Sequence, residues 1–323
     1  MCTAITFQAA STYFGRNLDN DISYNESVTI TPREFPFRFH YKESIPKHFA
    51  LIGMATVDNN YPLYYDATNE AGLSMAGLNF PGNAHYNKPS DLTDNIAPYE
   101  LIPWILGQCE STTEALSKIK TINITATPFS NDYPLTPLHW LVADKSTAYT
   151  IEQTIHGLNI HENPIGVLTN NPPFQFHMYN LINYLNLTAA EPTNRLTNLL
   201  HLQPYSRGMG AIGLPGDLSS SSRFIKATFT KLNSVHPSSE NDSISQFFHI
   251  LSSVAQQEGC VQTKNGLEKT LYSSCCDVEK CVYYYTTYSN SQITGVSLHK
   301  ENINGSQLIS YPLFTKQQIR MEN

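Results

Sequence analysis

The residue best suited to chemistry in this chain is a cysteine directly after the initiator methionine. Cys2 is a small residue, and a small residue at position 2 is compatible with removal of Met1. Removal would leave a thiol and a free α-amine on one residue, with ordinary pKa values of about 8.5 and about 7.7–8.0, so both groups are partly deprotonated near neutral pH. An N-terminal amine is a recognised base for a neighbouring nucleophile. Cys2 is therefore a candidate nucleophile, although its position alone leaves an ordinary, unreactive cysteine as an alternative.

Two charged residues follow Cys2 at a spacing that suits a first strand, a turn and a second strand. They are Arg16 and Asp19, in the segment YFGRNLD at residues 13–19. A guanidinium beside a thiol stabilises the thiolate, and a carboxylate can hold an α-ammonium group. We expect both to lie beside Cys2. The alternative is an exposed Arg–Asp pair near a turn.

Several blocks of sequence, taken together and in order, resemble the choloylglycine hydrolase family, which contains bile salt hydrolases and penicillin V acylases. The resemblance covers most of the chain. No single block would be specific for the family, but the combination of all the blocks is. The blocks are MCTAI at 1–5, YFGRNLD at 13–19, NEAGL at 69–73, GLNFPG at 77–82, GVLTNNP at 166–172, YSRGMG at 205–210, GLPGDLS at 213–219 and SRF at 222–224.

The resemblance implies a role for each matching residue. Cys2 would be the nucleophile, with Arg16 and Asp19 beside it, Asn79 and Asn170 as oxyanion-hole asparagines and Arg223 as a second arginine of the site. An amide donor aimed at the developing oxyanion is worth about 3–4 kcal/mol in acyl transfer. Two alternatives stay open: Asn171 is adjacent to Asn170, and Asn79 before Phe-Pro-Gly is also typical of a turn.

The resemblance also implies the reaction and its substrate. A bile salt hydrolase cleaves the amide of a glycine- or taurine-conjugated bile acid through a thioester. A steroid needs a large apolar cleft, for which we expect Leu18, Tyr24, Tyr65, Phe129 and Leu135; ordinary core positions are the alternative for each. Penicillin V acylase, with the same catalytic residues, is the second hypothesis. A non-catalytic binder of steroids or peptides is the third.

The elements that must position these residues are both strands and helices. Apolar patterns predict strands at 2–7, 27–30, 73–78 and 281–288, and helices at 98–108, 222–232 and 242–257, the last with Gly259 as its stop. Ser111 and Glu114 form a capping-box pattern that opens another helix. Strands and helices without strict alternation indicate layered sheets covered by helices.

The resemblance makes this expectation more specific. It implies an α+β fold, a four-layer αββα sandwich of the N-terminal nucleophile (Ntn) hydrolase type, with residues 1–323 forming one domain from which Met1 is removed. It also implies a homotetramer without cofactor or metal.

Composition limits the partners of the chain. Asp and Glu number 27 against 20 Lys and Arg, a formal charge of −7, which argues against nucleic acid and anionic membrane as partners. The N-terminus has no secretory signal pattern, so we expect a cytoplasmic protein with free thiols. Cys275, Cys276 and Cys281 lack the His or CxxC partners of a zinc site, and we expect buried thiols there.

Overall fold

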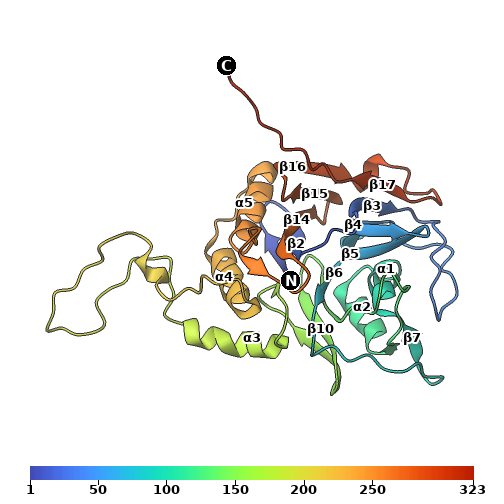
Figure 1. The fold of residues 1–323 in the computed structure, drawn as a ribbon, viewed down its shortest axis with the longest axis horizontal. Coiled ribbons are helices and arrows are strands. Elements are labelled where there is room, and N and C mark those ends of the chain that lie inside the picture. Colours follow the sequence, from blue (N-terminus) through green and yellow to red (C-terminus); the bar gives the residue numbers. More distant parts are fainter.

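The computed structural model describes residues 1–323, which form two large antiparallel sheets packed face to face (Figure 1). The first sheet contains, in spatial order, β12 (Val167–Leu168), β1 (Cys2–Gln8), β2 (Thr12–Asn20), β14 (Leu267–Asp277), β15 (Val282–Thr287) and β16 (Asn290–Ser297), with β13 (Val261–Gln262) paired to β14.

The second sheet has eight strands, in the order β11 (Gly157–Glu162), β10 (Ala148–Thr154), β9 (Leu138–Ala143), β6 (Ser74–Asn79), β5 (Tyr61–Asn69), β4 (Leu51–Asp58), β3 (Ser27–Thr31) and β17 (Ile309–Pro312). A short parallel pair, β7 (Asp94–Ile96) and β8 (Ile122–Ile124), lies apart from it. Strands β1 and β2 pack on β6 of the second sheet, which joins the two layers.

Helices cover both outer faces. Helices α4 (Ser220–Asn233) and α5 (Glu240–Ser252) pack on the first sheet, whereas α1 (Leu101–Leu106), which contacts α2 (Thr112–Ile119), packs on the second. Helix α3 (Phe174–Asn180) packs against α4. Four short 3₁₀ turns complete the chain: η1 (Pro98–Glu100), η2 (Leu181–Tyr184), η3 (Met209–Ala211) and η4 (Leu298–Lys300). The predicted αββα sandwich is confirmed.

Two apolar clusters fill the spaces between layers. One joins the inner faces of both sheets to the buried sides of α4 and α5, and the other lies between the second sheet and the helices α1 and α2. Removal of this apolar surface from water is the main favourable term in holding the layers together. No helix has the length and apolarity needed to cross a membrane.

The predicted elements match the structure except at some ends. The capping box at α2 forms only in part: the Glu114 backbone N–H donates to Ser111 Oγ at 3.3 Å, but the Glu114 carboxylate accepts from Glu110 N. The predicted helix at 98–108 is a 3₁₀ turn followed by α1, with Pro103 in the first helical turn, where no N–H is needed. The three neighbouring cysteines, Cys275, Cys276 and Cys281, are buried free thiols, as expected.

The predicted helix at 242–257 ends five residues early, at Ser252, and not near Gly259. The chain leaves the helix because Gln256 pairs with β14: its N–H donates to Thr270 Oγ1 at 2.7 Å, and its carbonyl accepts from Thr270 N at 3.0 Å. Thr270 in turn donates to Asp19, so this early end contributes to the site described below.

A long segment without regular structure, apart from η3, joins η2 to α4 and projects from the body of the molecule as an arm of residues 185–219 (Figure 1, yellow). It exposes several large apolar side chains, namely Leu185, Leu196, Leu199, Leu200, Leu202 and Tyr205.

Candidate active site

Cys2 begins β1 and lies opposite Leu18 of β2, with Ala4 opposite Arg16. Directly paired residues of an antiparallel ladder share a face, and side chains alternate along each strand. Cys2 and Arg16 therefore point to the same side of the first sheet, toward the second sheet. Arg16 Nη2 lies 2.5 Å from Cys2 Sγ.

Arg16 is completely buried between the sheets, yet each of its nitrogens has a partner. Nη1 donates to the backbone carbonyls of Gly77 at 2.6 Å and Tyr65 at 3.1 Å, and Nε donates to that of Asn17. Burial alone lowers the pKa of Arg16, but negative partners, Cys2 first among them, raise it above its ordinary value. The side chain therefore places a fixed positive charge against the thiol.

Asp19 lies on the opposite face of β2, toward the helices. Its Oδ1 accepts from Thr270 Oγ1 at 2.6 Å, while its buried Oδ2 has no hydrogen-bond partner and lies 3.9 Å from Arg223 Nη1. Burial raises the pKa of Asp19, and Arg223 and the N-terminal ammonium oppose this rise. Arg16 and Asp19 are thus buried separately on two faces, and the alternative of an exposed ion pair is wrong.

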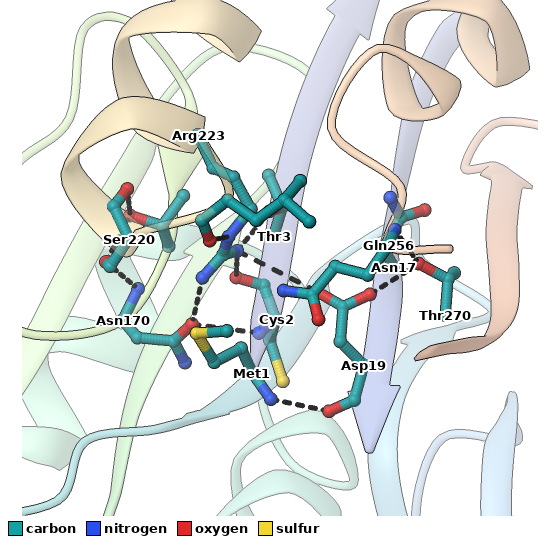
Figure 2. A network of polar contacts seen from close by, with 12 residues as sticks. Met1, Cys2, Thr3, Asn17, Asp19, Asn170, Ser220, Arg223, Gln256 and Thr270 are labelled. Carbon is teal, nitrogen blue, oxygen red and sulfur yellow. Dashed lines mark hydrogen bonds and ion pairs between the residues drawn. The ribbon is translucent and has the colours of Figure 1, made fainter. Parts of the chain in front are cut away.

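Arg223 and Asn170 join the remaining parts of the site (Figure 2). From α4, the Arg223 guanidinium donates to Asn170 Oδ1 at 2.7 Å, to Thr3 Oγ1 at 2.7 Å and to the Cys2 carbonyl. Asn170 Oδ1 also accepts from the Cys2 backbone nitrogen at 2.9 Å. The segment that carries Asn170 is fixed to the start of α4, because its backbone N–H donates to Ser220 Oγ.

The two candidate oxyanion asparagines are in contact. Asn170 Nδ2 donates to the Asn79 backbone carbonyl at 2.7 Å. Asn79 is the last residue of β6, and the residues after it form a turn, as the alternative interpretation predicted. Asn79 itself lines the cavity. Of Asn170 and Asn171, it is Asn170 that contacts Cys2. All six predicted catalytic residues therefore belong to one connected network.

Met1 is part of the same network. Its ammonium donates to the Asp19 carbonyl at 2.6 Å and to Glu268 Oε1 at 2.7 Å, and its carbonyl accepts from Asp19 N at 2.8 Å (Figure 2 shows Met1 beside Asp19). While Met1 is attached, the Cys2 nitrogen is an amide, and its lone pair is delocalised into the Met1 carbonyl, so it cannot act as a base.

A cavity of about 330 Å³ opens at Cys2. Half of its 24 lining residues are hydrophobic, and all five predicted substrate-contacting residues are among them: Leu18, Tyr24, Tyr65, Phe129 and Leu135. The volume and the mixed lining are typical of small-molecule sites. Tyr24 and Leu135 are also partly exposed, at 40% and 38%, so they are not core positions.

Several residues of the site were not predicted from the sequence. Thr270 and Glu268 come from β14, about 250 positions after Asp19, and Tyr99 and Tyr133 line the cavity. The backbone carbonyls of Asn17, Tyr65 and Gly77 accept hydrogen bonds from Arg16, and a backbone role of this kind cannot be predicted from residue type. Only the sheet order, which brings β14 beside β2, makes Thr270 and Glu268 neighbours of Asp19.

Comparison with known proteins identifies the family. The family model described as linear amide C–N hydrolases, choloylglycine hydrolase family, matches residues 2–311. The chain is 54% identical over 319 residues to a bile salt hydrolase/transferase of Lactiplantibacillus plantarum, with 98% of both chains covered. It is 35% identical to a bile salt hydrolase/transferase of Clostridium perfringens, with 96% of both covered.

Solved structures agree. The C2A mutant of conjugated bile acid hydrolase from Clostridium perfringens superposes with a TM-score of 0.93 at 35% identity, covering all of both chains. A penicillin V acylase from Agrobacterium tumefaciens has a TM-score of 0.73 at 17% identity, covering 97% of this chain and 92% of its own, which shows the shared fold alone. Sequence blocks, layer order and relatives agree, and the chain belongs to the choloylglycine hydrolase family of linear amide hydrolases.

Proposed function

We propose that this protein, once Met1 is removed, hydrolyses the amide bond of glycine- or taurine-conjugated bile acids with Cys2 as nucleophile. The observation that carries the proposal is the Cys2 thiol, 2.5 Å from the buried Arg16 guanidinium, at the end of a half-apolar cavity. Two full-length relatives named as bile salt hydrolases support the choice of substrate.

In this mechanism, Arg16 stabilises the Cys2 thiolate and the α-amine takes the thiol proton. The thiolate attacks the amide carbon, and the resulting oxyanion is stabilised by amide donors at Asn170 and Asn79. When the C–N bond breaks, the α-ammonium gives its proton to the leaving amine. Water then attacks the thioester and releases the free bile acid.

Asp19 and Arg223 position the α-amine in this proposal. Removal of Met1 converts the Cys2 amide into an ammonium or amine, which keeps Asn170 Oδ1 as an acceptor at its present distance of 2.9 Å. Asp19 Oδ2, which is buried and has no hydrogen-bond partner while Met1 is attached, supplies a negative charge for the new ammonium. Arg223 holds Asn170 and the Cys2 carbonyl in place.

The steroid would occupy the cavity beside Cys2. The Tyr24 and Tyr133 rings are tilted by 48° with their centres 6.0 Å apart, and the Phe129 ring lies edge-on to Tyr133 at 6.0 Å. These rings form an aromatic wall contributed by two loops. Leu18 and Leu135 add aliphatic surface, and the Tyr65 hydroxyl, 2.9 Å from Thr56 Oγ1, adds a polar group. An apolar wall with a few polar groups suits an amphipathic steroid.

We also propose a homotetramer located in the cytoplasm, without nucleic acid or membrane as a partner. The arm of residues 185–219 supports assembly, because it exposes large apolar side chains away from the body of the protein, and such exposure on one segment is typical of a protein interface. A second copy of this chain is the expected occupant.

The test compares three substrates with protein confirmed by mass spectrometry to begin at Cys2. We expect release of glycine from glycocholate and taurine from taurocholate, with little turnover of penicillin V. Dominant penicillin V cleavage would keep the mechanism and overturn the substrate. A Cys2→Ala variant that still binds bile salts but turns over none would support catalysis by Cys2. No turnover by the unmodified enzyme would favour a binder.

A further inference from the structure

Met1 occupies a position that is built like a binding site. It continues the β1–β2 ladder by one residue, with its ammonium on the Asp19 carbonyl at 2.6 Å and its carbonyl on the Asp19 N–H at 2.8 Å. A third contact, from the ammonium to Glu268 Oε1 at 2.7 Å, joins it to β14. Met1 also lines the cavity at Cys2.

Removal of Met1 leaves these three groups without their partners. Glu268 is the most affected, since its side chain is only 9% exposed and the Met1 ammonium is its sole hydrogen-bond partner. A carboxylate that is nine-tenths buried is costly to leave unpaired. The Asp19 N–H and C=O would face the same vacated space, one residue from the new α-ammonium of Cys2.

We propose that the position vacated by Met1 is a binding site for a free α-amino acid. The amino acid's ammonium takes the place of the Met1 ammonium between Glu268 and the Asp19 carbonyl. Its carboxylate accepts from the Asp19 N–H and pairs with the Cys2 α-ammonium, which replaces the former peptide bond. The inference rests on the proposed removal of Met1.

The spacing of the groups selects the ligand. The Glu268 carboxylate and the Asp19 carbonyl accept hydrogen bonds from an ammonium, and the Asp19 N–H donates to an oxygen. One residue, Met1, already satisfies all three groups, so we expect a free amino acid to fit. A lone cation or a lone anion would satisfy only some of them. Because the site holds a methionine and Met1 lines the cavity, the site should accept amino acids with side chains as well as glycine. Glycine, the proposed product, therefore binds beside the nucleophile and competes with the conjugated substrate. Taurine has the ammonium but a longer, sulfonate-bearing chain, and it fits less well.

The experiment measures inhibition of taurocholate hydrolysis, followed by cholate release, at constant ionic strength. We expect glycine and methionine to raise KM and leave kcat unchanged, and N-acetylglycine, which lacks the ammonium, to have no effect. Glu268→Gln should weaken glycine inhibition about tenfold or more, since a hydrogen bond between charged partners is lost. The matched control is Glu258→Gln, a surface carboxylate paired with Lys269, which should leave the inhibition unchanged.

A second measurement does not depend on the variant or on turnover. Calorimetric titration with methionine should detect binding to the chain that begins at Cys2 and none to the chain that retains Met1, produced with the methionine aminopeptidase inhibited. Equal binding to both chains, or equal inhibition by glycine and N-acetylglycine, would overturn the proposal. If the processed enzyme hydrolyses no bile salt but binds methionine, the proposed function fails and the amino-acid site stands.

Discussion

At the scale of single residues, the thiol and the backbone nitrogen of Cys2 contact different residues, which come from the two faces of the first sheet. Its thiol lies on the inner face against Arg16, and its backbone nitrogen contacts Asn170, which Arg223 holds from the helical face. Asp19 lies on the helical face with an unpartnered oxygen. In the proposed mechanism, different side chains therefore control the charge on the thiol and the proton transfer at the nitrogen.

The contact of Asn170 with Cys2 leads to a prediction that distinguishes two adjacent residues. Asn170→Ala should lower kcat by about 10²–10³, because an oxyanion donor is lost. Asn171→Ala is the matched control and should retain most of the activity. It is Asn170 that forms hydrogen bonds with Cys2, Arg223 and the Asn79 carbonyl. Steady-state kinetics with glycocholate provides the measurement. A larger loss at Asn171 than at Asn170 would reverse the assignment.

Arg223 should control the acidic side of the pH profile. Burial raises the pKa of Asp19, and Arg223 is the largest influence that lowers it. In the proposed mechanism the active form carries an ionised Asp19, so we expect activity to be lost as the pH falls through the pKa of Asp19. Arg223→Gln removes the opposing charge, raises the pKa of Asp19 further and should move the acidic limb of kcat/KM to higher pH by about one unit or more. Arg223→Lys keeps the charge and should move it less. A limb that stays in place in both variants would show that Asp19 does not govern it.

At the scale of elements, the site depends on how closely β2 approaches β14. Gly15 allows that approach: a Cβ there would lie 2.0 Å from the Ser274 carbonyl oxygen and 2.9 Å from Cys275 Cα, both backbone atoms of β14. Strand β2 carries Arg16 and Asp19, and strand β14 carries Glu268 and Thr270. Gly15 therefore keeps the two halves of the polar network together.

Gly15→Ala should destabilise the fold by about 2 kcal/mol or more, because the clash is with backbone that cannot rotate away. Urea unfolding followed by circular dichroism measures this change in the free energy of unfolding. Gly216→Ala is the control, because nothing lies within 4 Å of a Cβ at that position. It should change stability by about 0.5 kcal/mol or less. Equal stability of the two variants would mean that the strands can separate without loss.

At the scale of the whole molecule, the body buries most of its apolar residues in two clusters, whereas the arm packs Leu187 and Leu214 on the body and exposes several other large apolar side chains. Leu196 and Leu199 are 82% and 93% exposed. Neither side chain belongs to the two clusters, and the proposed tetramer would bury them in contacts between chains.

The double variant Leu196→Glu, Leu199→Glu should therefore disrupt the proposed tetramer without unfolding the body. Light scattering after gel filtration should give about four times the chain mass of 36.2 kDa for the unmodified protein and a smaller multiple for the variant. Leu92→Glu, at a position 94% exposed outside the arm, serves as the control and should stay tetrameric. A double variant that keeps the full mass would place the interface elsewhere.

The sequence by itself predicted the approximate positions of four strands and four helices, and its resemblance to a known family implied the αββα class and the six residues that meet at Cys2. It could do so because strand and helix patterns are local and because the blocks that carry Cys2, Arg16, Asp19 and Asn79 are contiguous motifs. Only the tertiary structure decided which face each side chain occupies, why α5 ends at Ser252, and that Glu268 and Thr270 belong to the site. Those features depend on the pairing of β2 with β14, which joins residues about 250 positions apart. Periodicity along a chain describes near neighbours and carries no information about the register between such distant strands.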